Sequence, residues 1–422
     1  MNGKVVVSQL GARMHYAVPR IFVNHGQLAH FYTDITATKG WPGIVKVLPT
    51  KILPSAIRRL AGRAPKGVPN ALTTTFASFG ALSAIRRSRI GNIADETSHA
   101  VWAGSRFSTL VAKSGFHGAS GLYAFSGDAL EQMEAAKQQG MWTVVEQMVA
   151  PRDVLEELVS REMTRFPEWM GLPKQNPFAR SFADRERAEW SLADLILCPS
   201  EFVRRHVIAC GGPAERCVLL PYGVDPKFSP ERKARRPGPL RVLTAGEVGL
   251  RKGSPYVAAA AEILGGATNF RMVGRLNLAD GPRQELSTKV ELKGVVPRAE
   301  MAAEFRWADI FLLPSVCEGS ATVVYEALAS GLPVVTTENT GTVVRDGIEG
   351  FIVPVGDPEA IASAIDRFVA DDELRAAMSL NATRRASEFT VNEYGKRLVA
   401  ALSVLPAERH NAGVRTIACT GS

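Results

Sequence analysis

The sequence predicts an α/β protein made of two units, each built on a parallel sheet. Two observations lead to this prediction. In both halves, short apolar runs without polar alternation are separated by helical stretches, which is typical of βαβ units whose strands are buried on both faces. Between Asp225 and Leu240, a segment rich in proline and charge interrupts this pattern, as expected of a linker. The length of 422 residues is sufficient for two domains.

The apolar runs define the expected strands. In the first half they are Lys4–Ser8, Gly121–Phe125, Trp142–Glu146 and Leu195–Pro199. In the second half they are Leu240–Ala245, Asn269–Val273, Lys293–Val296, Ile310–Pro314, Val334–Thr337 and Gly350–Val353. We therefore expect an N-terminal domain at residues 1–225 and a second domain at residues 226–390. Residues 391–422 are expected to form a C-terminal helix that packs back on the N-terminal domain, followed by a mobile tail.

The composition is that of a globular protein, with 46% hydrophobic and 7% aromatic residues. No apolar run reaches the roughly 18 residues of a membrane-spanning helix, and the N-terminus is typical of a first strand rather than a signal peptide. The five cysteines lack CxxC spacing and histidine clusters. This cysteine usage indicates a reducing cytoplasm and argues against a metal site.

The net charge of +8 is unevenly distributed, because no acidic residue occurs between Ile35 and Ala94. This stretch is either a solvated cationic surface or a surface that attracts anionic lipid headgroups or a phosphate-bearing acceptor. The mixture of apolar and basic residues in KVLPTKILPSAIRRLAGR favours an anionic membrane, and no nucleic-acid partner is expected because no binding motif accompanies the charge. The basic residues of the stretch are Lys39, Lys46, Lys51, Arg58, Arg59, Arg63, Lys66, Arg86, Arg87 and Arg89.

Residues 308–337, ADIFLLPSVCEGSATVVYEALASGLPVVTT, are the most informative part of the chain. The pattern predicts a buried strand, a loop of small residues, a helix that stops at Gly331 and a second buried strand. One acid, Glu318, lies in the loop, and another, Glu326, lies in the helix. The backbone N–H groups from Gly319 to Thr322 are placed to bind an anion at the start of the helix.

This stretch resembles the donor-site unit of the retaining glycosyltransferases of family 4, the group 1 glycosyl transferases with the GT-B fold, whose signature is E-x7-E. The resemblance extends over roughly residues 190 to 370. It implies that Glu318 is a catalytic acid facing the donor sugar and that Glu326 binds the ribose hydroxyls. The remaining donor-binding candidates are Gly319, Ser320, Ala321 and Thr322.

The turn GEVGLRKGSPYVAAA follows a strand and places Arg251 and Lys252 at the start of a helix. A diphosphate leaving group needs cations or oriented N–H groups, so both residues are catalytic candidates. Lys252 matches the lysine of the family, whereas the usual position of the family's arginine is taken by Glu247. Either Arg251 substitutes for that arginine, or only one cation acts directly.

The acceptor side is less clearly marked. Family members often have a histidine after a strand of the first domain, but the corresponding segment MWTVVEQMVAP has none. Glu146 in this segment either orients the sugar or acceptor or is a strand-end acid that faces water. His15 follows the first strand, at the edge where ligands bind in open α/β sheets, and is the second acceptor-side candidate.

No D-x-D triad, G-x-x-x-x-G-K-[ST] loop or G-x-G-x-x-G fingerprint is present, so we expect neither a metal ion nor another cofactor. The resemblance implies a GT-B fold, in which two Rossmann-like domains with parallel sheets face each other across a cleft. It further implies a metal-independent, cytoplasmic hexosyltransferase that moves a sugar from a nucleotide-sugar to a glycan, a lipid-linked sugar or a small molecule, in polysaccharide or glycolipid synthesis. The expected location includes peripheral contact with the inner membrane face. A GT-B sugar-nucleotide epimerase and a non-catalytic sugar- or nucleotide-binding protein on the same scaffold are the alternatives.

Overall fold

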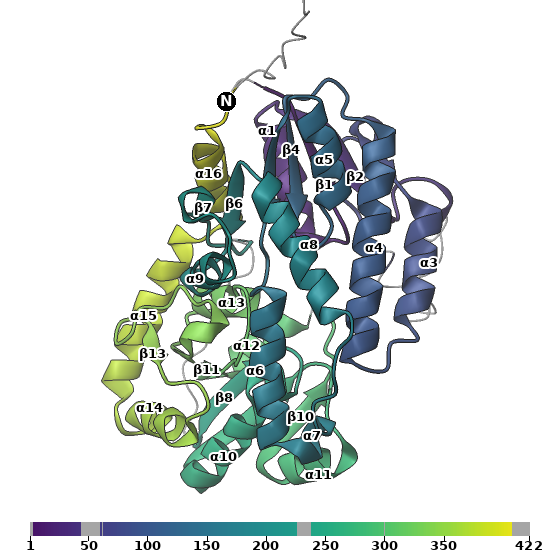
Figure 1. Ribbon diagram of the computed structural model, residues 1–422. Coiled ribbons are helices and arrows are strands. Elements are labelled where there is room, and N and C mark those ends of the chain that lie inside the picture. The colour runs from purple at the N-terminus through teal and green to yellow at the C-terminus, as the bar shows by residue number, and fades with distance from the viewer. Residues whose placement is uncertain (1–2, 44–59, 61, 226–237, 299, 407–422) are drawn as a thin grey trace, which may run out of the picture.

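The computed structural model describes residues 3–43, 60, 62–225, 238–298 and 300–406, and it contains two parallel sheets, one above the other in Figure 1. The expected linker at residues 226–237 and the expected mobile tail from residue 407 lie outside the described residues, as do residues 44–59 and 61 of the basic stretch. No helix within the described ranges is both long enough and apolar enough to cross a membrane.

The first sheet has the order β3-β2-β1-β4-β5-β6-β7, and all neighbouring strands are parallel. Every residue of β1, β4 and β5 is buried, because helices cover both faces of the sheet. The four strands expected in this half are present, while β2, β3 and β7 were not among the expected strands. The strands are β1 (Val5–Gln9), β2 (Leu28–Thr33), β3 (Thr73–Thr75), β4 (Gly121–Phe125), β5 (Trp142–Glu146), β6 (Leu195–Cys198) and β7 (Cys217–Leu219).

The second sheet has the order β10-β9-β8-β11-β12-β13 and is also parallel throughout. The prediction of a strand at Lys293–Val296 was wrong, because the strand runs from Val290 to Gly294 and Val295 is 76% exposed. An edge strand alternates buried and exposed residues, so it lacks the apolar run on which the prediction relied. The strands are β8 (Leu240–Ala245), β9 (Thr268–Val273), β10 (Val290–Gly294), β11 (Ile310–Leu313), β12 (Val334–Thr336) and β13 (Gly350–Ile352).

In most places an α-helix lies between successive strands of a sheet. Several begin with a side chain that accepts a backbone N–H, such as Ser200 before α9 and Thr390 before α16. Those before β8 are α1 (Ala17–Asn24), α3 (Ala77–Arg87), α4 (Ile93–Ser114), α5 (Leu130–Gln138), α6 (Arg152–Arg165), α7 (Pro167–Met170), α8 (Ala179–Leu192) and α9 (Glu201–Ala209). Those after β8 are α10 (Ser254–Leu264), α11 (Asp280–Lys289), α12 (Met301–Trp307), α13 (Thr322–Ala329), α14 (Pro358–Ala370), α15 (Asp372–Glu388) and α16 (Val391–Leu402).

Each sheet is covered in part by helices that the chain order places with the other sheet. α6 and α7 follow β5 of the first sheet, but they lie beside α10 and α11 in the lower half of Figure 1. Val159, Met163 and Trp169 of these helices belong to the apolar core of the second sheet, and the Tyr256 hydroxyl on α10 donates to Glu162 at 2.5 Å. Conversely, α16 packs on α1 in the upper half. The two domains therefore hold each other through exchanged helices.

Candidate active site

The predicted cations and the first predicted acid meet at the carboxyl ends of β8 and β11. The Lys252 ammonium lies 2.7 Å from Oε1 of Glu318, and the Arg251 guanidinium lies 2.6 Å from the same oxygen. Both cations stand on a short turn, Leu250–Lys252, that leads into α10. Ligands of open α/β sheets bind at this edge of the sheet, so the cluster occupies the place where a substrate is expected.

The loop that carries Glu318 is fixed from the side of β12. The Thr337 hydroxyl donates to the Ser315 carbonyl at 2.6 Å. The Asn339 amide donates to the Val316 carbonyl at 2.8 Å, and the Asn339 carbonyl accepts the Glu318 N–H at 2.9 Å. These bonds hold the acid in one position before any ligand arrives, which is the preorganisation that a catalytic site requires.

Lys252 is buried, with only 8% of its surface exposed. Burial, followed by the nearby charge of Arg251, lowers the pKa of the Lys252 ammonium, and Glu318 opposes this effect. Gly246, at the end of β8, has a positive φ of 135° and leaves room for the lysine, since a Cβ there would lie 3.1 Å from Cε of Lys252. The site thus keeps a cation out of water beside the acid.

The start of α13 follows the loop residues for which the sequence predicts an anion site. Ala321 precedes the helix without a side-chain cap, so the first-turn N–H groups of Thr322 and Val323 are directed out of the helix end. The Ala321 N–H itself donates to the Thr340 carbonyl at 3.2 Å. The buried Ser320 hydroxyl is hydrogen-bonded to the Tyr325 hydroxyl at 2.7 Å, which leaves the helix N-terminus as the group available to an anion.

Glu326 lies on α13 with 4% of its surface exposed. Its Oε1 is paired with the Arg298 guanidinium, and its buried Oε2 has no hydrogen-bond partner in the part of the chain that the structure describes. Burial raises the pKa of the Glu326 carboxyl, while Arg298 opposes the rise. A buried carboxylate oxygen without a donor is uncommon, and Oε2 is therefore available to a hydrogen-bond donor of a ligand.

Glu247, at the position where the resemblance leads one to expect an arginine, is engaged elsewhere. Its carboxylate is paired with Arg275 at 2.6 Å and accepts the Asn277 amide at 3.0 Å. Arg251, by contrast, reaches Glu318 together with Lys252. Of the two readings that the sequence left open, this arrangement favours substitution by Arg251.

The loop of Glu318 also touches the first domain. A Cβ on Gly319 would lie 1.7 Å from the Met148 carbonyl oxygen, so only glycine allows the loop after β5 to approach this closely. The Ser200 hydroxyl donates to the Gly319 carbonyl at 2.6 Å, and Arg205 pairs with Glu338 at 3.1 Å. The acid therefore lies at the junction of the two domains.

His15 lies in a sharply bent segment after β1. Met14, His15 and Tyr16 all have positive φ, at 44°, 50° and 61°. Such backbone is uncommon for residues other than glycine and is found preferentially at functional sites. Arg13 in the same segment pairs with Asp128, in the loop after β4, at 3.1 Å. The first domain thus presents a constrained turn and an ion pair at its carboxyl edge.

The pKa of the His15 imidazole is affected by burial and by three charged residues. Burial lowers the pKa of the His15 imidazole most, and the positive charges of Arg298 and Arg20 lower it further, while Asp225 raises it. Arg298 is the residue that pairs with Glu326. The charge of Arg298 thus affects both His15 and Glu326.

Glu146 is fully enclosed at the end of β5. Its Oε2 accepts the hydroxyl of Tyr123 and, at 3.3 Å, that of Tyr394, and Tyr222 contributes a further side-chain hydrogen bond. Burial raises the pKa of the Glu146 carboxyl, and the tyrosine hydrogen bonds oppose the rise. In this arrangement Glu146 joins β4 and β5 to α16, and only 2% of its surface is exposed.

Two carboxylates of α8 hold the loops that lead to this junction. Glu186 accepts the Gln147 amide and the Arg152 N–H, both at 2.7 Å, and burial raises its pKa to about 7. Glu189 accepts the N–H of Gly127 at 2.7 Å. The loops after β4 and β5 are thus anchored from behind by acids that no sequence motif had marked.

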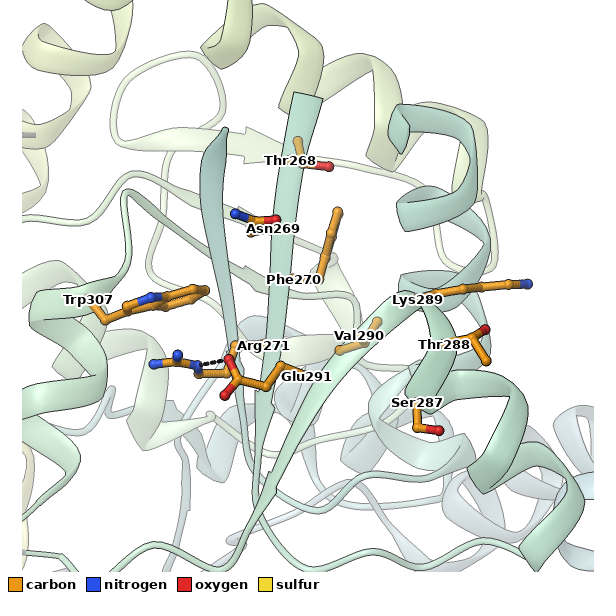
Figure 2. Close-up of a pocket in the computed structure, with 10 residues that line it drawn as sticks. All are labelled: Thr268, Asn269, Phe270, Arg271, Ser287, Thr288, Lys289, Val290, Glu291 and Trp307. Carbon is orange, nitrogen blue, oxygen red and sulfur yellow. Dashed lines mark hydrogen bonds and ion pairs between the residues drawn. The ribbon is translucent and has the colours of Figure 1, made fainter. Parts of the chain in front are cut away.

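A separate open groove lies along the outer edge of the second sheet (Figure 2). Arg271 pairs there with Glu291 at 2.7 Å, and its guanidinium lies 3.8 Å from the centre of the Trp307 ring. The groove involves the amino-terminal halves of β9 and β10, away from the carboxyl ends that carry Lys252 and Glu318. Its lining residues are Thr268, Asn269, Phe270, Arg271, Ser287, Thr288, Lys289, Val290, Glu291 and Trp307.

Comparison with curated proteins finds relatives whose names describe glycosyltransferases. The chain is 31% identical over 194 residues to the amylovoran biosynthesis glycosyltransferase AmsK of Erwinia amylovora, over 41% of this chain and 47% of that protein. It is 30% identical over 251 residues to the D-inositol 3-phosphate glycosyltransferase of Corynebacterium jeikeium, over 52% of this chain and 59% of that protein. The chain thus matches about half the length of these relatives.

Solved structures match nearly the whole fold. Sucrose-phosphate synthase from Thermosynechococcus elongatus superposes with a TM-score of 0.65 at 17% identity, over 94% of this chain and 97% of that one. Anabaena HepE in complex with UDP and glucose gives a TM-score of 0.59 at 16% identity, over 96% and 100%. The GT-B fold predicted from the sequence is confirmed. Residues 239–371 match the family model for glycosyl transferases group 1.

Proposed function

We propose that this protein is a retaining glycosyltransferase that moves a sugar from a nucleoside diphosphate sugar to an acceptor hydroxyl. The observation that supports the proposal most directly is the convergence of Lys252 and Arg251 on Glu318 beside the uncapped start of α13. The cations and the helix N-terminus suit a diphosphate, and the buried Glu326 suits the ribose of the same nucleotide.

In the proposed reaction the bond between C1 of the sugar and the diphosphate oxygen breaks, and its electron pair leaves with the diphosphate. The acceptor oxygen bonds to C1 on the same face, and its proton passes to the departing phosphate oxygen. Lys252 and Arg251 stabilise the charge that grows on the diphosphate, because fixed cations act most strongly where charge develops in the transition state. Glu318 faces the sugar and holds the cations until the donor arrives.

A panel of nucleotide-sugars with different bases and sugars tests this proposal. A ligand that binds only the folded protein raises the thermal midpoint, so at least one UDP-, GDP- or ADP-sugar should stabilise the chain. Turnover of that donor, with and without an acceptor, should then be measured in excess chelator and again with Mg²⁺ or Mn²⁺. The Glu318→Gln variant should bind the nucleotide but lose turnover. A panel in which no nucleotide-sugar binds would contradict the proposal.

The acceptor that we propose is a glycan or a lipid-linked sugar in polysaccharide or glycolipid synthesis in the cytoplasm. The support comes from the name of the Erwinia relative, which acts in amylovoran biosynthesis. The constrained turn around His15 and the Arg13–Asp128 pair lie on the side of the site where this acceptor would bind. Glu146 would influence the acceptor only through the loop and the tyrosines around it.

We further propose that the first domain touches an anionic membrane through the outer face of α3. Leu82 and Ile85 are 49% and 54% exposed on this helix, and Arg86 and Arg87 are exposed beside them, followed by Arg89. Exposed apolar side chains flanked by arginines suit a surface of anionic headgroups. Lys39 and Arg63 of the same basic stretch are instead used inside the protein, the latter paired with Asp34 at 2.7 Å.

A further inference from the structure

Glu326 has two carboxylate oxygens in unequal situations. Oε1 is paired with Arg298, whereas Oε2 is buried and has no hydrogen-bond partner among the described residues. The side chain of Glu326 is 5% exposed, and that of Arg298 is 53% exposed. The acid is therefore fixed inside α13, while the arginine reaches it from solvent.

The difference in exposure determines which of the two side chains can leave the ion pair. A buried carboxylate that loses its only cation retains a large desolvation cost unless another donor replaces it. A half-exposed guanidinium regains water on leaving, so the cost of separating the pair falls mainly on the buried acid. Arg298 precedes α12 in a stretch without helix or strand, so its side chain can move away without disturbing either sheet.

We propose that Arg298 stands where one ribose hydroxyl of the donor binds and that the ribose displaces it. This inference rests on the proposed function. A ribose diol carries two O–H donors, which match the two oxygens of Glu326. One hydroxyl reaches the unpartnered Oε2 directly, and the second must compete with Arg298 for Oε1. Arg298 is therefore a residue that sets how strongly the site prefers a ribonucleotide.

A comparison of ribose with deoxyribose isolates this competition. A 2′-deoxynucleotide has one ring hydroxyl, which binds Oε2 and leaves Arg298 in place. A ribonucleotide gains a second hydrogen bond but loses the pair between Arg298 and Oε1. Arg298 thus reduces the factor by which the site binds a ribonucleotide more tightly than a 2′-deoxynucleotide. Its attraction for the diphosphate is the same for both nucleotides and cancels in the ratio of their affinities.

The experiment measures the dissociation constants of UDP and 2′-deoxy-UDP by calorimetry, with GDP or ADP pairs in their place if the panel favours another base. The proteins are the full chain, Arg298→Ala and the control Arg306→Ala, whose arginine is exposed on α12. The work is done at pH 8, because loss of Arg298 raises the pKa of the Glu326 carboxyl further. Arg298→Gln replaces Arg298→Ala if the latter does not fold.

We expect the ratio of the 2′-deoxy-UDP to the UDP dissociation constant to rise about two- to fivefold in Arg298→Ala, the range for a half-exposed ion pair, and to stay unchanged in Arg306→Ala. An unchanged or smaller ratio in Arg298→Ala would overturn the inference, even if both nucleotides bind more weakly. If the unaltered chain binds none of the nucleotides, the proposed function fails, and this inference fails with it.

Discussion

The ammonium of Lys252 lies 2.7 Å from the same carboxylate oxygen of Glu318 that Arg251 contacts, so two cations share one acid. Under the proposed function, a diphosphate takes these cations from Glu318, and the acid then faces the sugar while the cations face the phosphate. The proposal therefore couples donor binding to the release of Glu318.

Lys252→Ala should reduce turnover more than donor binding, because the negative charge of the leaving group grows in the transition state. Loss of one such preorganised charge lowers kcat by about 10²- to 10³-fold. Initial rates at saturating donor, together with a dissociation constant for the same donor, separate the two effects. Lys289→Ala is the control, since Lys289 pairs with Glu262 on the far side of the domain at 2.6 Å. An unchanged kcat in Lys252→Ala would remove Lys252 from the mechanism.

Glu326→Ala should weaken nucleotide binding by about ten- to a hundredfold, the equivalent of roughly 1.5–3 kcal/mol for a hydrogen bond to a charged group. The loss should be equal for the nucleotide and its sugar conjugate, because the ribose is common to both. Calorimetric titration of both ligands measures it. Glu359→Ala, an exposed acid on α14, is the matched control. Equal affinity of Glu326→Ala and the unaltered chain would refute the assignment.

Arg298→Ala should raise the pKa of His15. Burial is the main cause that lowers this pKa, and the positive charge of Arg298 is the next, so removal of that charge favours the imidazolium. A titration of the His15 ring signals by NMR measures the shift. The control Arg283→Ala removes an exposed arginine of α11 and should leave the titration where it is. A fixed His15 pKa in Arg298→Ala would show that the two residues do not face each other.

The stability of the protein should fall relative to that of Glu186→Gln as the pH rises from about 4.5 to about 7. Burial raises the pKa of Glu186 from 4.5 to about 7. Both states are protonated below this window, and within it only the unfolded chain ionises, so the folded state loses up to about 3 kcal/mol relative to the variant. Denaturant unfolding at several pH values measures the difference. If the difference in unfolding free energy between the two proteins did not change with pH, the hydrogen bonds from Gln147 and the Arg152 N–H would be keeping Glu186 ionised in the folded state.

Binding to anionic vesicles should depend on the outer face of α3. Leu82→Ser combined with Arg86→Ser should weaken sedimentation with anionic vesicles at low salt, since both an apolar contact and about 1 kcal/mol of attraction per arginine are lost. Salt at about 0.5 M should abolish the binding of the unaltered chain by screening. Leu380→Ser, which alters an equally exposed leucine on α15, is the control. The membrane proposal fails if anionic and neutral vesicles sediment equal amounts of protein.

The local sequence was sufficient to predict those parts of the fold that one short segment determines. β11, the loop of Glu318 and α13 were predicted because strand, small residues, helix and Gly331 follow one another directly. β2 was missed because the polar His30 interrupts its apolar run, although His30 is buried and bonded to Thr74 at 2.8 Å. Such a partner on a neighbouring strand leaves no local trace.

The predicted site shows the same limit. Lys252 and Glu318 were found because each lies in its own recognisable turn. The surroundings of Glu146 were not foreseen, because Tyr123, Tyr222 and Tyr394 come from distant parts of the chain. Arg298 was missed for the same reason, since its contact with Glu326 exists only after β11 and α13 have folded beside the segment before α12.

The exchanged helices also determine how the chain can be divided. A fragment that ends at residue 225 would carry Val159, Met163 and Trp169 as apolar side chains without the core that buries them. A fragment that begins there would lose α6 and α7 and keep α16 with its buried face, including Leu398 and Leu402, exposed. Truncation at the linker should therefore give two insoluble halves, whereas co-expression of both should restore one protein. The two domains are therefore expected to fold as a single unit.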